Sequence, residues 1–412
     1  MASRPFRVPL HLAGLLALAV AMGIGRFAFT PVLPMMQADL GLSLAQGSWL
    51  ASANYLGYLL GALLVTHLSW QPAALLRRGL WLVVLMTAAM GLDNHWLGWL
   101  AWRLLAGVAS AWVLIGTSAL CIARLNASGQ TERSGVVFAG VGCGIAFAGL
   151  ACMGLTLVGT TASHAWLWLA AAALGGLLGA STLWRTAGTA PAAALPAGAV
   201  SPTSAGGTAA PKTMAADGAT AHTAPPLHWG LILCYGVYGF GYILPATFLP
   251  AQARLLVPDP WLFSLAWPVF GLAGAVSTVV ASRLTRRYTR PQIWAGSQVV
   301  MAVGVLAPAV WHALPAILLA ACCVGSTFMV ITMVGLQEAQ AAVGQAGAKR
   351  QMAAMTASFA LGQLIGPIFF SLTHAWFGAS LEFALVLGTL GLLAGAIPIL
   401  RLSSPAAVAT PD

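Results

Sequence analysis

The stretch GIGRFAFTPVLP at residues 23–34 recurs in the second part of the chain as GFGYILPATFLP at residues 239–250. Without a gap, the two glycines and the final Leu-Pro of one copy match those of the other. Each copy lies in an apolar segment long enough to cross a bilayer as one tilted helix. The repeat therefore predicts two halves built on the same plan.

The composition places both halves in a membrane. The chain has 412 residues, of which 59% are hydrophobic and only 6% are charged, and no soluble core could hide so much apolar surface. Apolar windows of about 20 residues, the length that crosses a bilayer, lie at residues 10–36, 48–68, 80–92, 97–123, 136–158, 166–184, 229–250, 261–284, 292–310, 314–336, 352–372 and 382–400. We therefore expect an all-α polytopic membrane protein with twelve transmembrane helices in two six-helix bundles.

The net charge of +10 would suggest a nucleic-acid partner in a soluble protein, but the charges are placed as in a membrane protein. With a cytoplasmic N-terminus, fifteen of the eighteen basic residues fall on the inner side, and only Arg254 lies in an outer loop. Acidic residues gather in the outer loops, at Asp39, Asp93, Asp259 and Glu382. The positive-inside rule therefore predicts that both termini are cytoplasmic, and we expect no nucleic-acid partner.

The repeat and the spans divide the chain into three parts. Residues 1–184 are expected to form the N-terminal six-helix bundle, and residues 229–412 the C-terminal six-helix bundle with a short cytoplasmic tail. Residues 185–228 consist mainly of Ala, Pro, Thr, Gly and Ser. Such a composition cannot bury enough apolar surface to offset the entropy of ordering, so it predicts a flexible cytoplasmic linker.

Several motifs resemble those of the major facilitator superfamily (MFS) of transporters. The stretches GIGRFAFTPVLPMMQADLGLS at residues 23–43 and YGVYGFGYILPATFLP at residues 235–250 are similar to its YbfB/YjiJ-like branch. RLLAGVASA at residues 103–111 resembles the superfamily's arginine followed by small residues at four-residue steps. GVGCG at residues 140–144 and GQLIGP at residues 362–367 resemble its glycine- and proline-marked helices five and eleven. The resemblance covers nearly all of the chain except the linker and implies the MFS fold.

The segment between the second and third spans departs from the superfamily's pattern. In the superfamily, this segment usually carries a glycine followed by an acidic residue and a basic cluster. Here Gly61, Arg77 and Arg78 match that pattern, but the acidic residue is absent. Its counterpart in the second half, SRLTRRYTRPQ at residues 282–292, is strongly basic and also lacks an acid. The resemblance therefore does not supply the usual acidic latch of the cytoplasmic gate.

Two arginines lie inside the expected spans. At 1.5 Å per residue, Arg26 lies about 24 Å along its span from Leu10, and Arg103 about 9 Å in from the outer end of its span. An unpaired charge at the bilayer centre costs at least about 2.5–3.5 kcal/mol, and no Asp or Glu occupies the middle of any span. Because a guanidinium fork suits a carboxylate, we interpret Arg26 as part of the substrate or coupling pathway. The alternative is a structural arginine bonded to neighbouring helices.

The resemblance implies a role for Arg103 in proton coupling or gating. Other polar side chains expected to face the same central cavity are Asn54, Tyr58, Tyr238, Tyr242 and Gln363. Glycines let helices approach closely, and prolines open the backbone ladder where a helix has to bend. The candidate gating or hinge residues are Gly23, Gly25, Pro31, Pro34, Gly107, Gly239, Gly241, Pro245, Pro250, Gly366 and Pro367. For each of these residues the alternative is ordinary helix packing.

These patterns predict a secondary active transporter that moves a small organic solute, such as an anionic metabolite, by alternating access. Proton coupling is implied by the resemblance alone. The alternative function is an exporter of amphipathic compounds or drugs, and a more remote one is a membrane sensor with a carrier fold. The chain has no phosphate-binding loop, and its six cysteines lie inside expected spans without metal-ligand spacing.

We therefore expect no enzymatic activity, no cofactor and no metal site. The expected partners are the small-molecule solute and membrane lipids. The protein is expected to be a multi-pass monomer in a bacterial inner (plasma) membrane.

Overall fold

The computed structural model describes residues 8–185, 226–256, 260–378 and 380–401. The expected linker at residues 185–228 lies almost wholly outside these residues. We call residues 8–185 the first half and residues 226–401 the second half. Every regular element in the described residues is a helix, so the expectation of an all-α chain is confirmed.

The first half opens with three consecutive helical pieces that form one continuous segment. These are α1 (Leu10–Leu18), the π-helix η1 (Ala19–Phe27) and α2 (Phe29–Leu40). The elements that follow are α3 (Leu44–His67), α4 (Pro72–Leu92), α5 (Trp96–Ala127), the short 3-10 turn η2 (Thr131–Arg133), α6 (Ser134–Leu157), α7 (Ala162–Ala180) and α8 (Thr182–Arg185).

One expected boundary is wrong in this half. The window at residues 80–92 predicted a short third span, whereas α4 begins at Pro72 and includes Arg77 and Arg78. Proline is favoured in the first turn of a helix, where its missing N–H is not needed. Long basic side chains can reach water from the end of a span, so the helix extends through the charged residues that the apolar window excluded.

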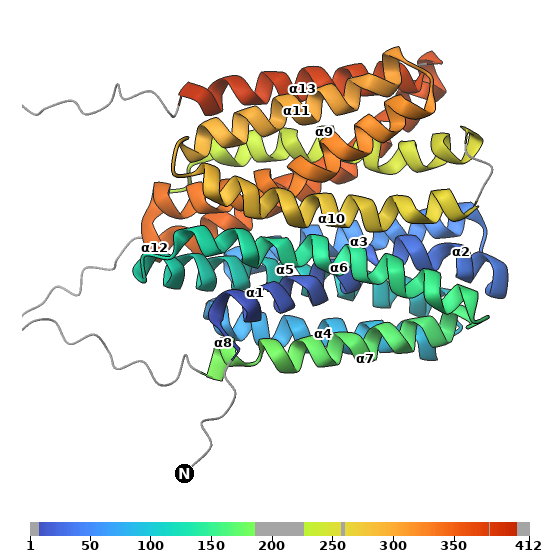
Figure 1. Cartoon of the computed structure of the whole chain (residues 1–412), viewed down its shortest axis with the longest axis horizontal. Coiled ribbons are helices and arrows are strands. Elements are labelled where there is room, and N and C mark those ends of the chain that lie inside the picture. The colour runs from blue at the N-terminus through green and yellow to red at the C-terminus, as the bar shows by residue number, and fades with distance from the viewer. Residues whose placement is uncertain (1–7, 186–225, 257–259, 379, 402–412) are drawn as a thin grey trace, which may run out of the picture.

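The described residues of the second half form five helices. They are α9 (Trp229–Leu256), α10 (Pro260–Leu284), α11 (Arg290–Val310), α12 (Leu314–Phe377) and α13 (Leu381–Arg401). A straight helix of 64 residues would be about 96 Å long, roughly three times the thickness of the hydrocarbon core. Gly344 breaks α12 with a φ of 68°, a conformation that glycine adopts without strain. Helix α12 therefore consists of two legs (Figure 1). The expected spans at 314–336 and 352–372 lie on either side of the break.

Ten helical segments of the described residues are long and apolar enough to cross a membrane. A shorter apolar helix lies at Trp229–Pro245. The broken α12 is included in a single segment, Pro315–His374. The chain is therefore a multi-pass helical membrane protein.

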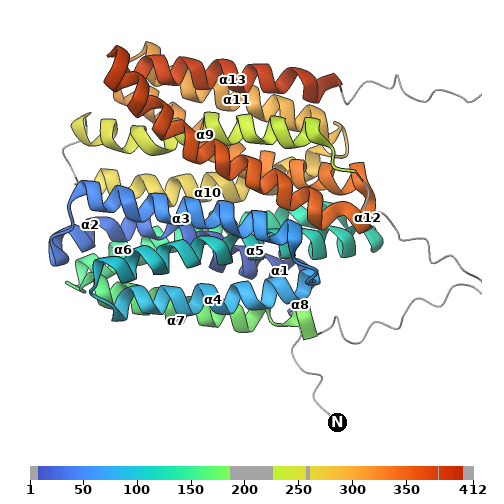
Figure 2. The same cartoon turned by 180° about the vertical axis from the view of Figure 1, so that it is seen from behind.

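The two halves lie side by side and meet along a long interface (Figures 1 and 2). Across it, α10 packs along α6, and α12 packs against α3 and α5. We call the end of the bundle at which α1 begins and α13 ends the basic end (Figure 1). The helix ends and turns at that end carry most of the arginines and lysines of the described residues, as the charge pattern predicted.

Candidate functional site

Arg26 lies near the end of η1, at the interface between the halves. Its side chain is buried, with only 3% of the residue exposed. Its Nη2 donates a hydrogen bond to Oε1 of Gln363 on α12. The guanidinium carbon lies 3.9 Å from the ring centroid of Tyr58 and 5.4 Å from that of Tyr55, within the range of cation–π attraction. Arg26 thus connects the two halves deep inside the bundle.

No carboxylate neutralises Arg26 within the described part of the chain, where the four ion pairs all involve other residues. The Nε and Nη1 atoms of Arg26 are buried without a hydrogen-bond partner. A buried unsatisfied polar group costs about 1–3 kcal/mol, and more when it is charged. The arrangement leaves two strong donors available to a bound anion.

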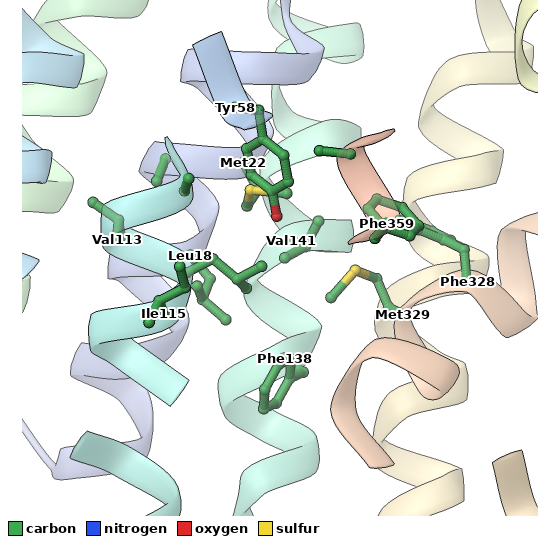
Figure 3. Packing of buried hydrophobic residues seen from close by; sticks show 14 of the residues in the cluster. Leu18, Met22, Tyr58, Val113, Ile115, Phe138, Val141, Phe328, Met329 and Phe359 are labelled. Atoms are coloured by element: carbon green, nitrogen blue, oxygen red, sulfur yellow. The ribbon is translucent and has the colours of Figure 1, made fainter. Parts of the chain in front are cut away.

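Arg26 lines a cavity of about 20 Å³, which is room for about one water molecule. Both halves line it, with Met22, Arg26, Phe27, Tyr58 and Leu114 from the first and Tyr235, Tyr238, Tyr242, Phe328, Met329, Thr332, Phe359 and Gln363 from the second. In Figure 3, Tyr58 and Met22 lie on one side of this interface and Phe328, Met329 and Phe359 on the other. The halves are therefore closed around Arg26.

The structure brings together five of the seven side chains that the sequence placed in a central cavity. They are Arg26, Tyr58, Tyr238, Tyr242 and Gln363. In the gapless alignment of the two repeats, Tyr242 occupies the position of Arg26. The Tyr238 hydroxyl donates a hydrogen bond of 2.6 Å to the backbone carbonyl of Phe328.

The other two candidates, Arg103 and Asn54, do not line the cavity. Arg103 bonds the backbone that carries Arg26, and Asn54 bonds the backbone of Arg103. The Nη1 and Nη2 atoms of Arg103 donate to the carbonyl oxygens of Gly25 and Arg26, each at 3.3 Å. Asn54 donates to the carbonyl oxygen of Arg103 at 3.0 Å. In a π-helix each carbonyl bonds the N–H five residues ahead, and Pro31 has no N–H to offer to Arg26. Arg103 supplies the missing donor; its role in proton coupling stays a prediction.

The aromatic residues around the cavity were mostly missed from the sequence. Tyr235 could have been found, because it lies three residues before Tyr238 and seven before Tyr242, on the same face of a helix. Phe328 and Phe359 gave no signal, because an aromatic residue inside an apolar span looks like ordinary packing.

The candidate glycines lie where helices come into contact. A Cβ atom added to Gly23 would lie 2.3 Å from the Cα atom of Gly144 on α6. One added to Gly239 would lie 2.3 Å from the carbonyl oxygen of Phe359, and one added to Gly107 would lie 2.1 Å from that of Asn54. These three glycines allow a backbone approach that no other residue permits.

The remaining gating candidates occupy helical backbone. The atoms nearest to added Cβ atoms at Gly25, Gly241 and Gly366 would be side-chain atoms, at 2.5–2.9 Å. Pro31 and Pro34 lie in α2, Pro245 in α9 and Pro367 in α12. Pro250 also lies in α9, but its side chain is outside the described residues. A hinge role for these residues stays a prediction.

At the basic end, a lysine links the two halves. The ammonium group of Lys349, on α12 five residues after Gly344, donates to the carbonyl oxygens of Leu68 at 2.6 Å and Trp70 at 3.0 Å. Leu68 is the C-cap of α3, where unpaired carbonyls carry partial negative charge. The carbonyl oxygens at and just after this helix terminus, and not an acidic side chain, thus bind the lysine.

Two further polar contacts join the halves at the same end. Nη2 of Arg286, after α10, donates to Oε2 of Glu132 before α6 at 2.8 Å. Nε2 of Gln337 on α12 donates to Oγ of Ser134 at 2.7 Å. Among the described side chains no three His, Cys, Asp or Glu residues gather as they would around a metal ion.

Comparison with known proteins extends this description. The model of a family described as "Uncharacterised MFS-type transporter YbfB" matches residues 18–400. In fold the chain is similar to the human organic anion transporter MFSD10 (TETRAN), with a TM-score of 0.67, 15% identity and coverage of 95% of this chain and 98% of that chain. It is also similar to FucP, an MFS transporter solved in the outward conformation, with a TM-score of 0.68, 14% identity and coverage of 96% and 99%.

At such low identities, these two similarities concern the fold alone. No protein with a curated description matches the chain. The family model, in contrast, matches nearly the whole length of the sequence. The chain therefore belongs to this family of YbfB-like MFS-type transporters.

Proposed function

We propose that this protein is a secondary transporter that moves a small organic anion by alternating access. The observation that carries the proposal is the buried guanidinium of Arg26, which has two unpartnered donors and lies between the halves. A carboxylate is its natural complement, because parallel hydrogen bonds form at once. An anion bound there contacts both halves, so its binding favours one arrangement of the halves over another. Proton coupling belongs to the proposal through the superfamily resemblance alone.

An amphipathic compound or drug is the second candidate cargo. It is favoured by the apolar and aromatic character of most residues that line the cavity. Uptake of labelled carboxylates and efflux of hydrophobic dyes, both measured in proteoliposomes, separate the two functions. An anion transporter shows carboxylate uptake that depends on Arg26, whereas an amphipathic exporter moves neutral dyes with or without that charge.

We also propose twelve spans, with both termini cytoplasmic, in a bacterial inner membrane. The break of α12 at Gly344 and the 28 residues of α9 support two spans beyond the ten apolar segments. The gathering of basic residues at one end supports the assignment of that end to the cytoplasm.

Reporter fusions test this topology. Fusions after Arg78, within residues 190–222 and after Arg401 should report the cytoplasm, because the positive-inside rule assigns all three places to the inner side. A fusion after Asn94, in the turn between α4 and α5, should report the periplasm. A periplasmic signal from any of the first three would contradict the twelve-span arrangement.

The hydrogen bonds from Lys349 to the carbonyl oxygens of Leu68 and Trp70, which we call the lysine latch, are proposed to hold the basic end closed. Loss of this latch should therefore open that end. We expect Lys349→Met to increase, about fivefold, the rate at which a cysteine introduced at Ala119 reacts with a membrane-impermeant thiol reagent in inside-out vesicles. A difference of about 1 kcal/mol between two states changes their ratio by this factor. Ala119 is buried on α5, and the same chain without the introduced cysteine corrects for the native thiols.

Two companion variants complete this experiment. Lys349→Arg keeps a cation that can bond the carbonyls of Leu68 and Trp70, so its labelling rate should stay near the original one. Arg350→Met removes the neighbouring exposed charge and should also leave the rate unchanged. Equal rates in Lys349→Met and Arg350→Met would show that the latch does not hold this end closed.

A further inference from the structure

We propose that the transported anion is an aromatic carboxylate, bound with its carboxylate on Arg26 and its ring among the aromatic side chains of the second half. This inference rests on the proposed function and narrows its substrate class. The guanidinium of Arg26 suggests an anion, and the aromatic lining of the same cavity suggests an apolar molecule. An aromatic carboxylate satisfies both.

The walls of the cavity are unusually rich in aromatic rings. Seven of its thirteen lining residues are Phe or Tyr, whereas aromatic residues make up 9% of the whole chain. They are Phe27, Tyr58, Tyr235, Tyr238, Tyr242, Phe328 and Phe359. The lining contains a single charged residue, Arg26. A small hydrophilic anion would satisfy the guanidinium but would lose its hydration against rings that offer it little in return.

The rings also present faces and edges suited to a planar ligand. Tyr242 stacks on Phe328 with centroids 5.6 Å apart and an interplanar angle of 18°. Phe27, from the first half, meets Phe328 edge-on at 6.4 Å and 85°. Aromatic pairs favour these offset-stacked and T-shaped arrangements. When the halves separate, Phe27 leaves Phe328, and a ligand ring can take over the contact that Phe27 makes here.

Gln363 occupies one of the places on Arg26 where a carboxylate oxygen can bind. Its amide Oε1 accepts a hydrogen bond from Nη2 of Arg26, as one oxygen of a carboxylate would. Nη2 belongs to both edges along which a guanidinium forms paired hydrogen bonds, one with Nε and the other with Nη1. Nη2 carries one N–H on each of these edges. A carboxylate that binds in the paired mode on the edge where Gln363 bonds displaces Gln363 and gives a partner to a donor that has none in this structure.

Because the cavity is closed, displacement of Gln363 by a ligand requires the two halves to separate. The cavity volume of about 20 Å³ is far below the roughly 300 Å³ at which ligand pockets begin, so a ring enters only when the halves part. Displacement of Gln363 removes the hydrogen bond that ties η1 to α12 at this depth. The ligand thus replaces a contact between the halves with contacts of its own to each half.

Ligand binding to the purified full-length protein, measured by the shift in thermal unfolding and by equilibrium dialysis, tests the inference. The four probes are phenylacetate, cyclohexylacetate with a non-aromatic ring, the neutral phenylacetamide, and succinate as a small hydrophilic anion. We expect phenylacetate to bind at least fivefold more tightly than cyclohexylacetate and at least tenfold more tightly than phenylacetamide and succinate. Arg26→Leu should abolish the preference for phenylacetate over phenylacetamide.

Two variants examine the ring and the displaced amide separately. Phe328→Leu should weaken binding of phenylacetate severalfold and leave that of cyclohexylacetate nearly unchanged. Gln363→Ala should strengthen binding of phenylacetate, because it removes the internal competitor for Nη2. Gln345→Ala, an exposed glutamine on the same helix, is the matched control, and Gln363→Leu replaces Gln363→Ala if the latter unfolds.

The outcomes separate this inference from the function on which it rests. If succinate or cyclohexylacetate binds as tightly as phenylacetate and that binding needs Arg26, the anion transporter stands and the aromatic substrate class is wrong. If phenylacetate and phenylacetamide bind equally in the original protein and in Arg26→Leu, both the anion transporter and the aromatic carboxylate are wrong. Unchanged affinity in Gln363→Ala, alongside that of Gln345→Ala, would show that Gln363 does not compete with the ligand.

Discussion

Replacement of Arg26 with leucine should abolish carboxylate uptake, and Arg26→Lys should lower it at least tenfold. Lysine keeps the positive charge but cannot form two parallel hydrogen bonds. A hydrogen bond to a charged group contributes about 1.5–3 kcal/mol, and about 1.4 kcal/mol corresponds to a factor of ten. The measurement is the initial rate of uptake into proteoliposomes, divided by the amount of monodisperse folded protein in each preparation.

The same variants test whether Arg26 is only a packing residue. In that case Arg26→Leu would remove a buried charge together with its hydrogen bonds, and uptake would follow the amount of folded protein. Arg350→Leu, which removes an exposed cation at the basic end, is the matched control and should transport normally. Normal uptake per folded molecule in Arg26→Leu would contradict a role in substrate binding.

Gly23→Ala should destabilise the protein far more than an alanine at an equally helical but open position. The new Cβ atom would lie 2.3 Å from the Cα atom of Gly144, so η1 and α6 would have to move apart. Overpacking of this kind costs about 1–3 kcal/mol. We expect a lower midpoint of thermal unfolding in detergent and a lower yield of folded protein.

Gly175 on α7 provides the control, because a Cβ atom there has nothing within 4 Å. Alanine favours a helix over glycine by about 1 kcal/mol, so Gly175→Ala should unfold at the same temperature as the original protein or slightly above it. If both alanine variants unfold at the same temperature, the approach of η1 to α6 is not the reason for the glycine at position 23.

The helical membrane fold could be predicted from this sequence because a bilayer imposes a long apolar run on every span. Arg26 and Gln363 could be found for the same reason, since a polar side chain is conspicuous in such a run. The sequence could not show that these two residues bond each other, because they lie 337 positions apart. It could not distinguish Phe328 and Phe359 from packing residues, since aromatic rings serve equally well in a core and in a binding cavity.

The π-helix η1 could not be predicted from the local sequence either. Its glycines and Pro31 marked the segment as irregular, but they are compatible with a kink, a bend or a π-turn. The donors that complete it come from Arg103 on another helix. A backbone geometry that is stabilised by a side chain 77 positions away cannot be inferred from the segment that adopts it.

The two repeats differ at the one position where each contributes to the cavity, with Arg26 in one and Tyr242 in the other. A perfectly symmetric site would hold a cargo equally well when the cargo is turned end over end. With a cation on one side only, the two orientations have unequal energies, so the proposed anion should keep its carboxylate towards the first half throughout transport. A dicarboxylate would find a charged partner for one of its ends and none for the other.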